Sequence, residues 1–126
     1  MEYEEFKQAI EELEQAFQVS AENFYSSLFA ITSTIGKDVT TEWLLGYAKS
    51  RKADYDRSKA IVKKNPKLRT INNGVATIHN LMDYRLCTFI AENLSEFVDA
   101  GKTEYPLLFA YDTRMDGPPE ALPEEF

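Results

Sequence analysis

The sequence has a single cysteine and a single histidine among its 126 residues. Cys87 therefore cannot form a disulfide within the molecule, and its apolar neighbours predict a small buried side chain instead of a reactive thiol. Because His79 is the only histidine of the sequence, zinc or iron sites that need several histidines are excluded. His79 and Asp83 are four residues apart and could contact a metal together, but a partly buried histidine paired with a neighbouring carboxylate is the simpler interpretation.

Catalytic motifs are also missing. The five glycines stand alone, at positions 36, 46, 74, 101 and 117, so no glycine-rich phosphate loop is present. Two carboxylate pairs, Glu11 with Glu14 and Glu96 with Asp99, have the spacing that all-α nucleotide pyrophosphohydrolases use for Mg²⁺, but 81 residues separate them, which is far more than that arrangement usually shows. We therefore predict a protein that is not an enzyme and has no cofactor, catalytic or metal site. A Mg²⁺-dependent nucleotide hydrolase is the weaker alternative.

Long apolar runs are absent as well. No stretch approaches the ~20 apolar residues that a helix needs to cross a bilayer. The first fifteen residues are acidic and amphipathic, which is typical of neither a secretory signal nor a transit peptide. These features predict a cytoplasmic protein that does not associate with membranes.

What the sequence does have is charge sorted into blocks. Residues 49–69 hold nine of the fourteen Lys and Arg residues and only two acids, a net charge of +7. Residues 1–48 and residues 70–126 each carry −7, and the whole chain carries −7. A charge distribution of this kind steers charged partners, so we expect function to depend on electrostatic recognition.

Apolar residues recur at steps of three and four through the first part of the chain, which predicts one long helix over residues 2–35 that Gly36 ends. The pattern also allows a bend near residue 20. A second helix follows, with Asp38 or Thr40 as its cap. Asn65–Pro66 ends this helix, because a residue before proline avoids the α conformation. Its apolar stripe includes the following residues: Trp43, Leu44, Tyr47, Ala48, Tyr55 and Val62.

Residues 65–74 read as a connection that contains a turn at Asn73–Gly74, although the next helix could begin earlier in it, at Leu68 or Ile71. The periodicity then predicts a helix over about 75–99 that ends near Gly101. The short apolar segment Tyr105–Tyr111 fits a strand, a last helical turn or an extended strap over the bundle, and the lack of a second convincing strand argues against a sheet.

Together these segments predict an all-α fold, a three- to four-helix antiparallel bundle formed by residues 1–112 as one domain. Residues 113–126 are rich in proline and acids, so we expect an extended, flexible acidic C-terminal tail. Three amphipathic helices with many large aromatic residues leave an apolar surplus. We predict a homodimer that covers it, although the sequence does not distinguish a dimer face from a ligand pocket.

The acidic start of the chain carries the first functional hypothesis. A dense carboxylate face can occupy the basic groove of a nucleic-acid enzyme by imitating phosphate groups. We predict a non-enzymatic protein-binding module, an inhibitor or immunity-type protein (anti-toxin or phage anti-defence), whose partner has a basic surface. The residues assigned to this acidic face are Glu4, Glu5, Glu11, Glu12 and Glu14.

The basic segment 49–69 carries the alternative, a small nucleic-acid-associated regulator. Lysines on one helix face could grip phosphates while Tyr47 and Tyr55 stack on bases. The acidic flanks would repel a long polyanion, however, and the simpler interpretation is a solvated helix face paired with acidic neighbours. The basic stripe consists of Lys49, Lys52, Lys59, Lys63 and Lys64.

Overall fold

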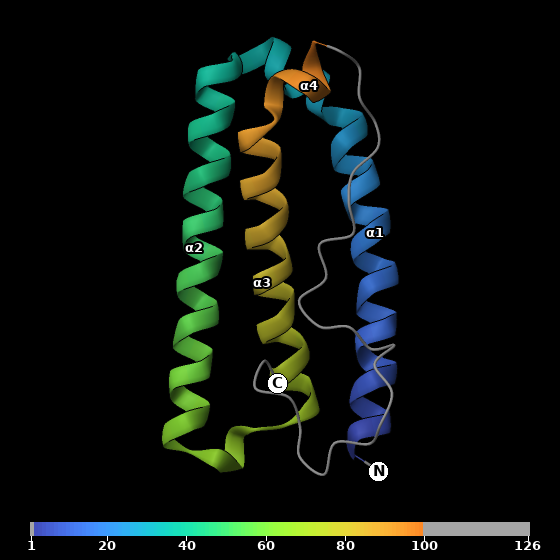
Figure 1. Ribbon diagram of the computed structural model, residues 1–126, viewed down its shortest axis with the longest axis vertical. Helices are drawn as coiled ribbons and strands as arrows, with labels where there is room; N and C mark the ends of the chain where they lie inside the picture. Colours follow the sequence, from blue (N-terminus) through green and yellow to red (C-terminus); the bar gives the residue numbers. More distant parts are fainter. Residues whose placement is uncertain (1, 100–126) are drawn as a thin grey trace.

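The computed structural model describes residues 2–99, and those residues form an antiparallel bundle of helices (Figure 1). The long helices are α1 (Glu2–Ile35), α2 (Lys37–Lys64) and α3 (Ile71–Glu92), and the short elements are the 3₁₀ helix η1 (Pro66–Leu68) and α4 (Leu94–Val98). No strand occurs between residues 2 and 99. The predicted all-α bundle of three to four helices is therefore confirmed.

Residues 100–126 lie outside the described part of the chain. They include the predicted stop at Gly101, the segment Tyr105–Tyr111 and the predicted acidic tail, 113–126. The division into a domain of 1–112 and a tail stays a prediction. Within residues 2–99, no helix combines the length and the apolar character that a membrane crossing requires.

The connection between α1 and α2 is the single residue Gly36. Its φ of 87° lies in the left-handed region, which glycine enters without strain, and its amide donates to the Thr32 carbonyl at 2.7 Å. The predictions of one continuous first helix and of Gly36 as its end are confirmed. The predicted caps of α2, Asp38 and Thr40, are wrong. So short a connection makes Gly36 itself the N-cap, and Thr40 is already inside the helix, where its hydroxyl donates to the Gly36 carbonyl at 2.7 Å.

The connection between α2 and α3 is shorter than predicted. Helix α2 ends at Lys64, ahead of Pro66, as predicted. The turn predicted at Asn73–Gly74 is wrong, because α3 begins before it, at Ile71. Ile71 is the later of the two early starts that the sequence allows, the other being Leu68. The Thr70 side chain caps the helix by accepting a hydrogen bond from the Asn73 amide at 3.3 Å, so Asn73 and Gly74 belong to its first turn.

The single helix predicted over 75–99 is interrupted at Asn93. The Asn93 side-chain amide donates to the Phe89 carbonyl at 2.8 Å, an alternative partner of the kind that asparagine offers to a helical backbone. The chain then turns into α4, which lies across the end of the bundle beside the α1–α2 connection (Figure 1). Phe97 of α4 is buried, and its ring centroid lies 4.8 Å from that of Tyr25 on α1.

The core has one close interface and one wider interface. The backbones of α2 and α3 approach each other along much of their length, whereas α1 makes far fewer close backbone contacts with either helix. Helix α2 offers small or medium side chains such as Leu44 and Ala48 to the core, whereas α1 inserts the rings of Phe6, Phe17 and Tyr25. These rings hold α1 at a distance, and the wider interface is where the structure leaves a cavity.

Candidate functional site

The predicted acidic residues of α1 are mostly exposed. Glu4, Glu5, Glu11 and Glu12 are exposed, whereas Glu14 is partly buried. With 100° between successive residues of a helix, the five carboxylates spread over about half of the circumference of α1. The structure therefore places a broad acidic surface, not a narrow stripe, on the N-terminal part of this helix.

The predicted basic stripe is partly occupied by contacts within α2. Lys49, Lys63 and Lys64 are exposed, whereas Lys52 and Lys59 are partly buried. Lys52 pairs with Asp56 at 2.9 Å. The Nζ atoms of Lys52 and Lys59 also lie 4.9 and 5.3 Å from the ring centroid of the same buried tyrosine. This ring, that of Tyr55, is only 7% exposed and is not available to stack on a base.

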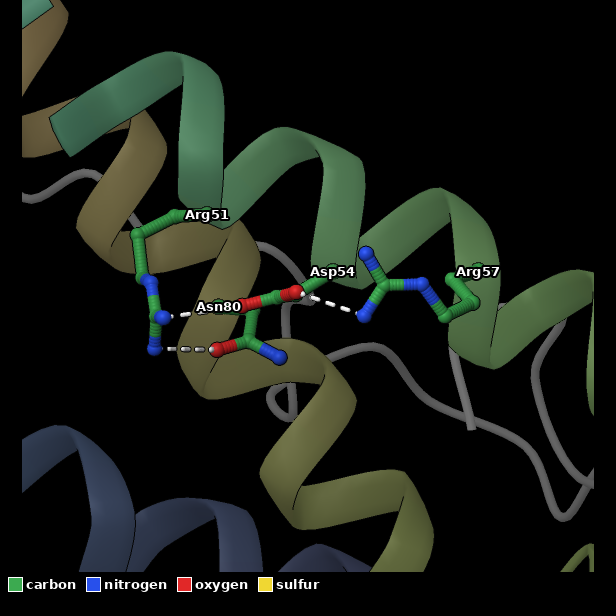
Figure 2. A network of polar contacts seen from close by, with 4 residues as sticks. All are labelled: Arg51, Asp54, Arg57 and Asn80. Atoms are coloured by element: carbon green, nitrogen blue, oxygen red, sulfur yellow. Dashed lines mark hydrogen bonds and ion pairs between the residues drawn. The ribbon is translucent and has the colours of Figure 1, made fainter. Parts of the chain in front are cut away.

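A polar network around Arg51 joins α2 to α3 (Figure 2). Asp54 accepts from Arg51 at 2.8 Å and from Arg57 at 3.0 Å, and Arg51 also donates to the Asn80 side-chain oxygen at 3.2 Å. Asp54 and Asp56, the two acids of the basic segment, are thus both engaged within α2 itself. No sequence pattern predicts the hydrogen bond from Arg51 to Asn80, because this bond depends on how α2 and α3 are rotated against each other.

A cavity of about 310 Å³ opens between α1, α2 and α3. It contains none of the glutamates of the predicted acidic face and none of the lysines of the predicted basic stripe, but it does contain Tyr47, which was predicted to stack on bases. Its walls are mainly aromatic and aliphatic, with a few polar groups toward α3. The lining residues are Phe17, Ser20, Ala21, Phe24, Trp43, Tyr47, His79, Asp83, Leu86 and Cys87.

One wall of the cavity is a column of rings. Trp43 and Tyr47 are one turn apart on α2 and stack with 5.9 Å between centroids, and Phe24 of α1 stacks on Trp43 at 6.4 Å. At the Tyr47 end of this column the Arg51 guanidinium lies over the Tyr47 ring, 5.3 Å from its centroid. Trp43 nevertheless remains 52% exposed at the edge of the bundle. The column therefore presents a large apolar surface that the protein itself only partly covers.

The polar end of the cavity holds His79 and Asp83, whose Nε2 and Oδ1 atoms are 3.7 Å apart. The predicted pairing is confirmed, but the burial is the reverse of the expectation, because the histidine is half-exposed and the carboxyl is the more buried partner. Burial raises the pKa of Asp83, and the positive charges of His79 and Arg51 oppose this effect only in part. Burial also raises the pKa of Tyr47, to which the negative charge of Asp83 contributes.

Cys87 is buried beside the cavity as a free thiol, as the sequence predicts. Burial, assisted by the negative charge of Asp83, raises the pKa of its thiol from the ordinary 9.0 to about 11. The thiolate is the nucleophilic form, so Cys87 is inert at neutral pH.

We expect iodoacetamide at pH 8 to leave Cys87 unmodified in the folded protein and to alkylate it fully in guanidinium chloride, as measured by mass spectrometry.

The folded protein holds the Cys87 thiol proton up to about pH 11, whereas the unfolded chain releases it near 9.0. The free energy of unfolding should therefore fall as the pH rises between these values. Cys87→Ala should show a smaller fall over the same range, and equal curves for both proteins would contradict the shifted pKa.

The two carboxylate pairs weighed for Mg²⁺ do not meet. Tyr25 contacts α4, and about 17 Å of helix separate it from Glu14. Asp99 pairs instead with Lys37. Among residues 2–99, no group of three or more His, Cys, Asp or Glu side chains is arranged to hold a metal ion. The geometry therefore gives no support to the hydrolase alternative.

Comparison with known proteins finds no matching family, no matching curated protein and no matching solved structure. The helical bundle and its surface chemistry are therefore the basis for a functional assignment.

Proposed function

We propose that this protein is a non-enzymatic protein-binding module whose acidic α1 surface covers a basic site on a partner protein. The acidic α1 surface consists of Glu4, Glu5, Glu11 and Glu12. One observation carries the proposal: all four side chains are exposed, and none is paired with a Lys or Arg of the described chain. Their negative charge is therefore available to a partner.

The finer proposal is an inhibitor or immunity-type protein, of the anti-toxin or phage anti-defence kind. A row of exposed carboxylates imitates the phosphates of a nucleic acid, so its natural target is a groove lined with Lys and Arg. The net charge of −7 adds long-range attraction that raises the association rate. Occupying such a groove blocks the partner without any chemistry on the inhibitor.

Charge reversal tests this proposal. We expect Glu11→Lys with Glu12→Lys to reduce capture of the partner, identified by affinity purification and mass spectrometry from the native cell, on the order of tenfold at low salt. The matched control reverses Glu42 and Glu92, which are also exposed and give the same change in net charge. Unchanged capture by the α1 variant would contradict the proposal. Equal losses in both variants would show that net charge, not this surface, attracts the partner.

The alternative proposal, a nucleic-acid-associated regulator, depends on the exposed Lys49, Lys63 and Lys64. The burial of Tyr55 leaves phosphate contact as its main source of affinity. Retardation of a labelled oligonucleotide at low salt that disappears in Lys49→Glu with Lys63→Glu would favour this alternative over the inhibitor.

The homodimer also stays a prediction. Several large apolar side chains are exposed, and they are spread over both long N-terminal helices. Phe29 and Val19 lie on α1, and Val39, Leu45 and Ile61 lie on α2.

A further inference from the structure

We propose that the cavity between α1, α2 and α3 receives an arginine side chain of the partner protein, with the Asp83 carboxylate as the group that binds its guanidinium. This inference rests on the proposed function, because it names the side chain by which a basic partner would be anchored. It involves a part of the molecule separate from the acidic α1 surface, so the two can be tested independently.

The shape of the cavity suits a long amphipathic side chain. Its volume of about 310 Å³ falls within the range of sites that enclose small ligands. Phe17, Phe24 and Trp43 provide an apolar wall for the methylene groups of an arginine, which pack on apolar surface while the charged head reaches a polar group. Trp43, half-exposed in the free protein, is the kind of residue that a partner buries at the centre of an interface.

The chemistry of Asp83 suits a guanidinium. Among residues 2–99 its one ion-pair partner is His79, and at 3.7 Å this pair is too long for a hydrogen bond. A carboxylate has room for several donors, and a guanidinium supplies two parallel N–H groups to it. The nearby Arg51 is already held by Asp54 and Asn80, so it does not occupy this carboxylate.

The stacked rings favour arginine over an alkylammonium ion. A cage for an ammonium ion needs ring faces that are open to the cation. Here Phe24, Trp43 and Tyr47 stack on one another, and Arg51 covers the far end of the column. The protein also contains a precedent for the proposed contact, because the nitrogens of Arg51 bind a carboxylate and an amide oxygen (Figure 2). The same guanidinium lies over the ring of Tyr47.

The test uses short peptides and the intrinsic fluorescence of Trp43, the single tryptophan of the chain. We expect acetyl-Gly-Arg-Gly-amide to change this fluorescence saturably, with a dissociation constant on the order of 1 mM. The same peptide with citrulline, which is neutral, or with lysine, which offers only a point charge, should bind at least about tenfold more weakly. Equal binding of either peptide, or no saturable change with arginine, would overturn the proposal.

Two substitutions complete the test. Asp83→Asn should weaken binding of the arginine peptide about tenfold, whereas Glu42→Gln, the same charge change at an exposed site, should leave it unchanged. Burial disfavours the charged form of Asp83, so the neutral amide is expected to fold at least as stably at pH 7, which circular dichroism can verify. Unchanged binding in Asp83→Asn would overturn the proposal.

The same peptides separate this inference from the proposed function. Glu11→Lys with Glu12→Lys should bind the arginine peptide as the native sequence does, because these residues do not line the cavity. If this variant no longer captures the partner, and neither it nor the native protein binds the arginine peptide, the acidic surface is supported and the arginine pocket is refuted. If binding of the arginine peptide depends on Asp83, and charge reversal on α1 leaves capture of the partner unchanged, the pocket is supported and the acidic surface is refuted.

Discussion

Phe97→Ala is expected to lower the free energy of unfolding by about 3–5 kcal/mol, the range for removing a buried aromatic side chain. Phe97 is only 6% exposed, and its ring lies 4.8 Å from Tyr25 and 5.9 Å from Phe89. Helix α4 has five residues and is too short to be stable alone, so Phe97 and the smaller Leu94, its two buried side chains, attach it to the bundle. Urea unfolding followed by circular dichroism measures the effect.

Phe29→Ala is the matched control for this prediction. The chemical change is identical, but Phe29 is 63% exposed on α1, so its removal should change stability by no more than about 0.5 kcal/mol. Similar losses in the two variants would mean that Phe97 is not packed as the structure places it.

Arg51→Ala is expected to lower the free energy of unfolding by about 2 kcal/mol, because it removes charge-assisted hydrogen bonds from a partly buried position. Arg51 binds Asp54 on its own helix and Asn80 on α3 (Figure 2). Its guanidinium also lies over the ring of Tyr47. The substitution therefore removes a polar link between two helices and one end of the ring column at once. Thermal and urea unfolding provide the measurement.

Arg57→Ala controls for charge, because Arg57 binds the same carboxylate, Asp54, at 3.0 Å. Its side chain is 67% exposed, however, and exposed ion pairs contribute only about 0.5 kcal/mol. If Arg57→Ala lowers the free energy of unfolding as much as Arg51→Ala does, the hydrogen bond from Arg51 to Asn80 does not contribute measurably to stability.

The sequence was sufficient to predict the three long helices, because each depends on a pattern within a single segment. Apolar steps of three and four extend to the end of α1, and Gly36 follows at the point where a left-handed residue is needed. The end of α2 was equally plain from Asn65–Pro66. Local rules of this kind do not require knowledge of neighbouring helices.

The errors occurred where one local signal competed with another. Asn73–Gly74 is a turn signal, but the Thr70 cap starts α3 ahead of it. Asn93 lies in a strongly apolar helical pattern, but its side chain binds the Phe89 carbonyl and the helix ends. Propensity alone does not decide which of two such signals prevails, because packing around the segment settles the outcome.

The candidate sites differ in how far the sequence revealed them. The charged residues are expected on the surface from their chemistry alone. The cavity was not predicted, since Trp43 and Tyr47 were assigned to the same apolar stripe as Leu44 and Ala48. In the structure the latter two are buried, whereas the former two lie at the cavity, facing residues from α1 and α3. Which part of a stripe enters the core depends on the rotation of each helix against its neighbours.

The unequal spacing of the helices has a consequence for motion. Helices α2 and α3 share the close interface, while α1 is held mainly by large rings. We therefore expect the first sub-global opening of the molecule to be the release of α1 from an intact α2–α3 hairpin, with backbone amides of α1 exchanging with solvent before those of the hairpin. Such an opening would widen the cavity, because α1 forms one of its walls.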